Sequence, residues 1–442
     1  MATPRRLRNT RPSASERNNA NKKTAPARQP FLKERKTSLF KDKKNVLRLM
    51  GFIAAVAVAI YAFTSGILSV GHKEPGYYDV GLTAEGSAML YGSGVHLLAY
   101  AEGGSSQVRM TLNETQKAFT AALLHAWQLL DARQTYAGIN NLAVLNQADG
   151  APVRIGETLY GILNDALERT QRGEGYTLFS GMLHQEWTTL RYLDEPDQYD
   201  PLLNSQEAAL MADMARLTAD PGSFRLTLTA PDTASFSVSA ECRDFMEQQA
   251  IDAPLLDLNL LRDAYLLELT ADGLREQGYA AGYLYSESGY SLWLESAGDM
   301  RYDLYGLAER GVTAIGTLTV PAPAAYCQFT AFPLDGERYG YYTVEANGRQ
   351  YRRHAYINPA DGDYAGVLMT AGLGSGSASL ADLGYAMAVI NTLPGQEAVE
   401  AYLGGLPEDI AAFYTLQDNE TTVYTNAAAQ LKLYKDSGYS IH

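Results

Sequence analysis

Residues 49–71 read LMGFIAAVAVAIYAFTSGILSVG, a run without a charged side chain between Arg48 and His72. As a helix, these 23 residues would extend about 34 Å, which exceeds the roughly 30 Å hydrocarbon core of a bilayer. The segment therefore predicts one transmembrane helix, and everything before it differs in composition from everything after it.

Charge is distributed unevenly on the two sides of this segment. Residues 1–48 contain fifteen Lys or Arg and three acidic residues, a net charge of +12, so the remainder carries −26 of a total of −14. Basic flanks of transmembrane helices stay in the cytoplasm, so the body is expected outside. A cleaved signal peptide is the competing interpretation, but its apolar region usually has only about 7–15 residues and its basic region is short.

The segment before the span has few apolar residues, which predicts a disordered basic cytoplasmic head over 1–48. Residues 72–83 are expected to form a linker and residues 84–442 an extracytoplasmic domain. The basic head favours contact with anionic lipid. The acidic body makes nucleic acid an unexpected partner, so we expect the membrane and an extracytoplasmic protein instead.

The body shows helical spacing early and strand alternation later, which predicts an α+β or mixed α/β fold with a large, mostly antiparallel sheet and packed helices. An Asn113–Gln116 capping pair is expected to open the first long helix. Between the first two helices, residues 138–154 are expected to be irregular. The predicted helices are 113–131, 157–171, 205–217, 258–277, 380–393 and 396–403. The predicted strands are 88–91, 95–101, 107–112, 224–228, 236–238, 283–285, 291–294, 301–305, 314–320, 325–332, 341–344, 350–357, 366–371, 412–416, 422–424 and 431–434.

Two local features have both a structural and a functional interpretation. Cys242 and Cys327 permit one disulfide or two buried thiols, and no CxxC pair or His cluster accompanies them to form a zinc site. The Gly/Ser-rich stretch 372–379 precedes a predicted helix, an arrangement that can hold a phosphate on free N–H groups. Ser379 and Asp382 in the same place have the spacing of a capping box.

Five motifs follow one another through the body with a characteristic spacing. They are Asn140–Asn146 with the apolar step at 152–155, Leu183 with Trp187, the segment DLNLLRDAY at 257–265, the segment AYINPADG at 355–362, and ADLGYAM at 381–387. This order resembles the ApbE-like family of FAD:protein FMN transferases and covers most of residues 84–442. The resemblance implies an ApbE-like domain, FAD and Mg²⁺ as cofactors, and a partner protein whose hydroxyl group accepts FMN.

Carried over residue by residue, the resemblance assigns a magnesium ligand to Asp382 and nucleotide contacts to four further residues. His354 is a weak catalytic candidate, because the family's histidine position holds Ala355 and a shift of one residue turns a strand side chain to the other face. The four expected nucleotide contacts are Asn146, Asp257, Tyr265 and Asn358.

Each of these residues also has an ordinary structural interpretation. Asp382 could only cap its helix, and Asn146 and Asn358 could only stabilise a loop and a turn. Asp257 and Tyr265 could only cap and pack a helix start. His354, which follows Arg352 and Arg353, could contact a phosphate or lie on an exposed strand face.

The family's chemistry is altered at several positions. Asn259, Leu260 and Ala264 replace glycines that let a nucleotide approach the backbone, Asp263 replaces a lysine, and Ala386 replaces a threonine. These changes predict a membrane-anchored relative whose transfer activity is lost or strongly impaired, whose flavin binding is weak or absent, and which acts as a binding or structural module. The alternative is an active Mg²⁺-dependent transferase that attaches FMN to a Ser or Thr of a partner.

Overall fold

The computed structural model describes residues 74–90, 92–295, 298–308, 311–322, 324–334, 340–364, 366–419 and 421–442. The chain divides into two compact units, 1–71 and 72–442, and every described residue belongs to the second. The predicted head at 1–48 and the predicted span at 49–71 lie outside the described residues. Among the described helices, none combines the length and the apolar character that crossing a membrane requires.

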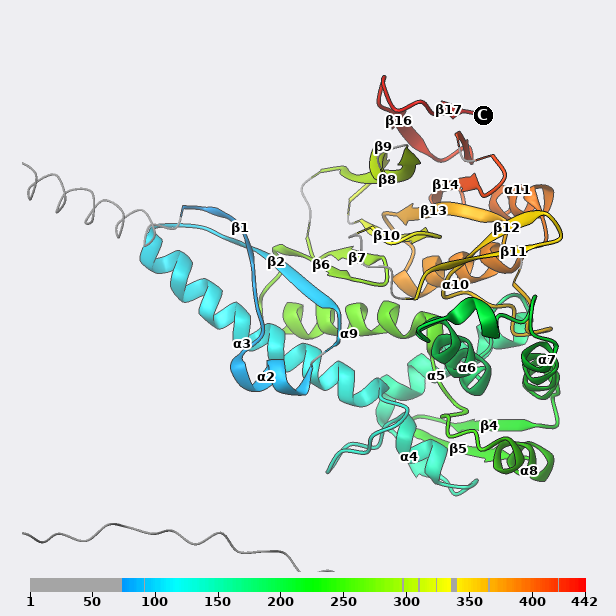
Figure 1. The fold of residues 1–442 in the computed structure, drawn as a ribbon. Helices are drawn as coiled ribbons and strands as arrows, with labels where there is room; N and C mark the ends of the chain where they lie inside the picture. Colours follow the sequence, from blue (N-terminus) through cyan, green and yellow to red (C-terminus); the bar gives the residue numbers. More distant parts are fainter. Residues whose placement is uncertain are drawn as a thin grey trace, which may run out of the picture. The chain divides into compact units, whose positions relative to one another are not determined.

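The described chain alternates helices and strands, with most strands in its second half (Figure 1). The helices are α2 (Ala84–Met89), α3 (Ser105–Leu130), α4 (Leu142–Gln147), α5 (Gly156–Arg172), α6 (Gly181–Arg191), η1 (Pro196–Tyr199), α7 (Ser205–Ala219), α8 (Ala240–Gln249), η2 (Asn259–Leu261), α9 (Arg262–Glu276), α10 (Leu380–Thr392) and α11 (Gln396–Gly404). The strands are β1 (Gly76–Asp79), β2 (Val95–Ala101), β3 (Val153–Arg154), β4 (Phe224–Thr229), β5 (Thr233–Val238), β6 (Gly282–Ser286), β7 (Tyr290–Trp293), β8 (Met300–Ala308), β9 (Gly311–Val320), β10 (Ala325–Thr330), β11 (Tyr342–Ala346), β12 (Arg349–Arg353), β13 (Leu368–Ser375), β14 (Ala411–Leu416), β15 (Thr422–Thr425), β16 (Gln430–Leu433) and β17 (Ser440–Ile441).

A nine-stranded sheet with the order β1-β2-β6-β7-β10-β13-β14-β15-β17 forms the centre of the described unit. Its neighbouring strands pair antiparallel except β15 with β17, which are parallel. The predicted fold class, a mixed α/β domain with a large and mostly antiparallel sheet, is therefore confirmed.

Helices α3, α9 and α10 cover one face of the large sheet (Figure 1). In β2, residues alternate between buried and half-buried, so that Val95, Leu97 and Ala99 point into the core that the helices complete. Eleven of the thirteen residues of α10 are buried, which explains its apolar composition all round. The burial of α10 places its N-terminus, the predicted site of Asp382, among other helices.

A three-stranded sheet, β16-β9-β8, packs against the opposite face and encloses a second, smaller core. Tyr302 of β8 stacks on Tyr326 of β10, with ring centroids 4.0 Å apart. Another three-stranded sheet, β3-β5-β4, lies beside α4 and α5 and contains the predicted hairpin at 224–238. Both cysteines are buried free thiols, which agrees with the second of the two interpretations above.

Three local predictions near the start of the domain were wrong. Residues 84–89 form α2 rather than a strand at 88–91, and residues 107–112 belong to α3, whose N-cap is Gly104. The expected capping pair at Asn113 is therefore inside a helix. The alternation Val108, Met110, Leu112 imitates a strand, but Val108 continues the buried helical stripe that reaches Ala118 and Phe119.

Other boundaries also moved because tertiary pairing decides them. Residues 76–79 of the predicted linker form β1, which pairs with β2. The irregular stretch 138–154 contains α4 and β3, residues 372–375 of the Gly/Ser-rich stretch belong to β13, and residues 354–357 lie beyond the end of β12.

A fully buried ion pair fixes the β11–β12 hairpin to the residue that follows η1. Arg353 is 2% exposed and Asp200 is 0% exposed, and the guanidinium donates from Nε and Nη2 at 2.7 and 2.6 Å. The Tyr342 hydroxyl donates to the same carboxylate at 2.8 Å. Tyr364 lies beneath the guanidinium, 4.4 Å from ring centroid to Cζ. The Arg353 guanidinium is out of reach of water, and among the described residues only the Asp200 carboxylate forms an ion pair with it.

Replacement of this carboxylate should be costly. We expect Asp200→Ala to lower the free energy of unfolding by about 3–5 kcal/mol, because it leaves the Arg353 charge buried and unpaired. Tyr342→Phe removes one hydrogen bond to the carboxylate and should cost about 2 kcal/mol. Urea denaturation of the two variants measures the difference, and a loss below 1 kcal/mol for both, on the order expected for an exposed pair, would contradict the analysis.

Candidate functional site

A buried arginine on α5 connects two of the predicted site residues. The Arg169 side chain is 4% exposed, and its Nη1 lies 3.0 Å from Asp382 Oδ1 on α10. Its Nη2 donates to both carboxylate oxygens of Asp165, at 2.9 and 3.0 Å, one helical turn earlier on α5. The guanidinium therefore lies between two carboxylates from different helices.

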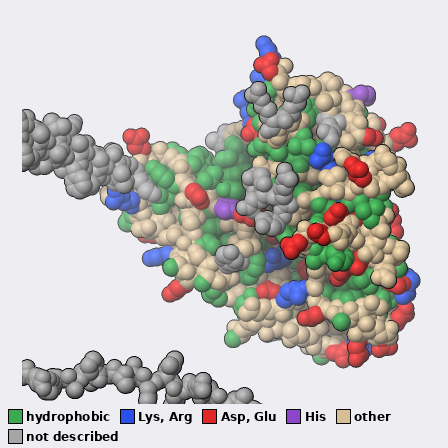
Figure 2. Space-filling view, in the orientation of Figure 1, with side chains coloured by type: hydrophobic (Ala, Val, Ile, Leu, Met, Phe, Trp, Pro, Cys, Tyr) green, Lys and Arg blue, Asp and Glu red, His purple; other side chains and the backbone are tan. Residues whose placement is uncertain are grey.

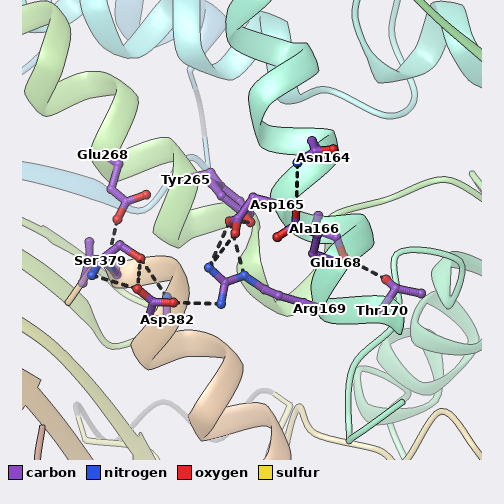
Figure 3. A network of polar contacts seen from close by, with 11 residues as sticks. Asn164, Asp165, Ala166, Glu168, Arg169, Thr170, Tyr265, Glu268, Ser379 and Asp382 are labelled. Carbon is purple, nitrogen blue, oxygen red and sulfur yellow. Dashed lines mark hydrogen bonds and ion pairs between the residues drawn. The ribbon is translucent and has the colours of Figure 1, made fainter. Parts of the chain in front are cut away.

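Helix α9 joins the same network through Tyr265. Its hydroxyl donates to Asp165 Oδ2 at 2.5 Å, so Tyr265 and Asp382 are linked through Asp165 and Arg169 (Figure 3). The structure thus brings together the predicted metal ligand and one predicted nucleotide contact. The side chains that link these two residues are those of Asp165 and Arg169.

The N-terminus of α10 is closed by carboxylates. Ser379 and Asp382 form the capping box expected from the sequence: Asp382 N donates to Ser379 Oγ, and Ser379 N and Oγ both donate to Asp382 Oδ2. Glu268 of α9 accepts the N–H of Leu380 at 2.6 Å (Figure 3). The N–H groups that a phosphate would use at this helix start, as the Gly/Ser-rich stretch suggested, are therefore already satisfied.

Burial and neighbouring charges shift the pKa values in this network in opposite directions. Burial raises the pKa of Asp382, but the hydrogen bond from Ser379 and the charge of Arg169 outweigh it and leave that pKa below 3.8. Burial raises the pKa of Glu268 to about 7, against the hydrogen bonds from Leu380 and Ala381 and with support from Asp382 and Asp165. Burial, followed by the bond to Asp165, also raises the pKa of Tyr265. At neutral pH, Asp382 is thus ionised and Glu268 titrates.

A second cluster holds two further predicted contacts. Asn146 on α4 accepts from Leu256 N and donates to Leu256 O, both at 2.9 Å, so its amide pairs with the backbone as a neighbouring strand would. The N–H of Asp257 donates to Leu178 O, and its carboxylate accepts the N–H of Asn259 at 3.0 Å. These contacts fix the loop before η2.

Asn259 has a backbone conformation that glycine usually adopts, but its side chain fills the space that a glycine would leave open. Its φ of +48° lies in the left-handed region. Its side chain donates to Ser180 Oγ at 2.9 Å and to Asp257 O at 3.0 Å, so it occupies the space beside the loop. Asp263 accepts a 2.5 Å hydrogen bond from Ser288 Oγ.

His354 and Asn358 lie apart from both clusters. The expectation that His354 lies on an exposed strand face was wrong: it is 2% exposed, its Nδ1 accepts the N–H of Tyr356, and its ring packs edge-on against Phe329. Burial, followed by the nearby arginines, lowers its pKa well below 6.5, so the ring is neutral. In the described contacts the Asn358 side chain bonds only within its own turn, accepting from Ala360 N and donating to Asp361, and its backbone bonds to Gly362 and Asp363.

The residues around Asp382 do not fit a magnesium ion. One carboxylate oxygen accepts from Ser379 and the other from Arg169, whose positive charge lies where a cation would compete. The Ala386 side chain has no oxygen to offer, and a hard cation needs several oxygen ligands. Within the described ranges, no group of three or more His, Cys, Asp or Glu side chains could hold a metal ion.

Three members of the network were not predicted: Asp165, Arg169 and Glu268. The sequence does contain a signal for the first two. Arg169 follows Ala166 by three residues on the buried stripe of α5, and Asp165 lies one turn before it. A charged residue on an apolar stripe requires a partner, but the stripe does not show which helix supplies Asp382.

A cavity of about 270 Å³ lies elsewhere, between α11 and the strands β14 and β15. It is lined by Glu400, Tyr414, Tyr424, Asn426 and His442, among others. None of the predicted site residues lines it. It therefore gives no support to a nucleotide cleft at the network.

The comparisons with known proteins support the fold. The structure is similar to the crystal structure of the ApbE protein from Thermotoga maritima, with a TM-score of 0.54 and 11% identity over 80% of this chain and 97% of that one. It is also similar to a mutant of the flavin transferase ApbE from Vibrio cholerae, with a TM-score of 0.45 and 12% identity over 80% and 98%. No protein-family description and no curated protein matches the sequence. The ApbE-like fold predicted from the motif order is thus supported.

The raised pKa of Glu268 makes stability depend on pH. The folded carboxyl titrates at about 7 and the unfolded one near 4.5, so the folded state binds more protons between these values and stability falls as the pH rises through this window. Glu268→Gln stays neutral and can still accept the Leu380 N–H. We expect this variant to gain up to about 3 kcal/mol relative to wild type between about pH 5 and pH 8.

Urea denaturation at both pH values measures this gain. The same substitution at Glu397, an exposed acid in the first turn of α11, is the matched control. A relative gain at Glu268 no larger than that at Glu397 would show that the buried position of the carboxyl has no effect.

Proposed function

We propose that this protein is a membrane-anchored, extracytoplasmic relative of the flavin transferases that has lost transfer chemistry and acts as a binding or structural module. The ApbE-like fold supports the family relationship. The uncharged segment 49–71 and the +12 charge before it support the anchor and its orientation.

The observation that carries the loss of chemistry is the Arg169–Asp382 contact of 3.0 Å. A magnesium ion would neutralise the charge that develops on a diphosphate leaving group. Here a fixed guanidinium already neutralises the one carboxylate that could hold the ion, and Ser379 occupies its second oxygen. To bind magnesium, the site would have to break the ion pair of Asp382 with a buried guanidinium and a helix cap together.

The flavin side of the reaction meets comparable obstacles. The Asn259 side chain fills the place of a glycine, Glu268 occupies N–H groups at the start of α10, and Asp263 adds negative charge. A carboxylate near phosphate groups costs on the order of 1 kcal/mol or more in a partly buried site. Neither candidate at the family's histidine position supplies the proton acceptor, since Ala355 has no ionisable group and His354 is buried.

We expect no Mg²⁺-dependent release of AMP from FAD by the purified full-length protein in the presence of a substrate protein, and weak or absent FAD binding by calorimetry. Loss of a general base typically costs about 10²–10⁴-fold, and a lost electrostatic stabiliser costs a comparable factor. Asp382→Asn should leave this result unchanged while lowering stability by about 1 kcal/mol through the weakened cap.

The alternative, an active transferase that modifies a Ser or Thr of a partner, predicts the reverse. Release of AMP by the wild-type protein that Asp382→Asn abolishes would establish that activity and identify Asp382 as a metal ligand. Equal stability of the two proteins would separately show that the capping box contributes little.

The topology can be tested directly in intact cells. Protease added outside should digest the body and leave the segment 1–48 protected, because that segment is expected in the cytoplasm. An epitope tag at each end of the chain reports the two fragments. Recovery of the body in the medium with a new N-terminus after residue 71 would instead indicate a cleaved signal peptide.

A further inference from the structure

The face of the large sheet opposite α3 and α9 is covered by β16-β9-β8 only in part. Over β1, β2, β6 and β7 it carries a set of aromatic side chains placed by strand register. Figure 2 shows hydrophobic side chains gathered over this part of the sheet. We call this set the aromatic row; its members are Tyr77, Tyr100, Trp293, Tyr283, Tyr285 and His96.

The rings of the aromatic row contact one another without interruption. From Tyr100 to Tyr77, Trp293, Tyr283, Tyr285 and His96, successive ring centroids are 5.1, 5.8, 4.8, 5.6 and 4.9 Å apart. Tyr77 and Trp293 meet edge to face at 87°, so they form two walls of a corner. Tyr77 is 53% exposed and the other rings are partly exposed, so ring surface is available to a ligand.

The charges around the row are negative. Asp79 lies on the same face in register with Leu98 and Tyr283, and Glu287 follows β6 with its side chain 75% exposed. Both carboxylates act on Tyr285, whose pKa is raised by partial burial first and by these charges second. The strands β1, β2, β6 and β7 contain no Lys or Arg, although His96 Nε2 of the row lies 3.4 Å from Glu287 Oε1 and can pair with it when protonated.

We propose that the aromatic row binds a Lys- or Arg-rich segment of a partner protein. Aromatic faces attract cations, guanidinium groups stack on them, and the two carboxylates complement the same charge. The six rings come from four strands and contact one another in succession, so the row offers several ring faces and accommodates more than one cationic side chain. An acidic surface also excludes the other ligand for stacked aromatic platforms, single-stranded nucleic acid, whose backbone requires a positive groove.

This inference deepens the proposed binding role but does not depend on the loss of transfer activity. The two fail separately, because release of AMP from FAD concerns Asp382 and Arg169, whereas the row lies on the opposite face of the sheet. The segment 1–48 is also rich in Lys and Arg, but the proposed topology places it on the other side of the membrane.

The probe is a fluorescently labelled oligo-arginine peptide, titrated by anisotropy with the full-length protein in an uncharged detergent at low salt. The double variant Tyr77→Ala, Asp79→Asn changes two exposed side chains and should weaken binding about tenfold, through one lost cation–π contact and one lost charge. The matched control is Tyr199→Ala, Asp197→Asn on η1, which removes another exposed Tyr and Asp at the same spacing and should leave binding unchanged.

A peptide of the same length built from glutamine tests the ligand class and should not bind. If the two double variants lose the same amount of affinity for the arginine peptide, the aromatic row is not the binding site and only general charge attraction remains. Binding of the glutamine peptide as tight as that of the arginine peptide would overturn the cationic class, and absence of binding to the wild-type protein would overturn the proposal altogether.

Discussion

A guanidinium group removed from water must have its charge balanced by groups that the fold places around it, because the cost of desolvating an unpaired ion is several kcal/mol. Arg169 imposes this requirement at the meeting point of three helices. Asp165 balances it from α5, Asp382 from α10, and Tyr265 of α9 fixes Asp165 in turn. Helix α10, which lies almost wholly inside the domain, supplies the second of the two carboxylates that this charge contacts.

The same requirement separates the architecture from the chemistry of the site. Relatives can share the layers of sheet and helix while the side chains at the start of α10 serve different purposes. In this chain, the cap at Ser379, the carboxylate of Glu268 and the ion pair at Asp382 form a closed set of donors and acceptors. These contacts stabilise the start of α10. They also occupy the backbone N–H groups and carboxylate oxygens with which a nucleotide or metal would interact.

Much of the fold could be read from the sequence because local pattern and tertiary environment agree there. The stripes of α5 and α7, the hairpin at 224–238 and the later strands are examples, and the capping box at Ser379 was recognisable from two residues. Prediction failed where two patterns overlap, as at Val108 to Leu112. It also failed for His354. A histidine that follows two arginines is expected to be exposed, and the sequence does not show that Phe329 and Tyr364 pack against it. The partner of Arg169 is 213 residues away in sequence, and no local pattern encodes that distance.

The two cysteines can serve as chemical probes of how the domain unfolds. Burial raises the pKa of Cys242 to about 11 and raises that of Cys327 further, so neither is a reactive thiolate while the chain is folded. Cys242 belongs to α8, near the edge of the domain, whereas Cys327 belongs to β10 in the middle of the large sheet. Alkylation by a small reagent at each thiol therefore reports a different event, local fraying of the periphery at one and cooperative disruption of the central layer at the other. The rates of alkylation at Cys242 and Cys327 thus distinguish local opening of the domain from its global unfolding.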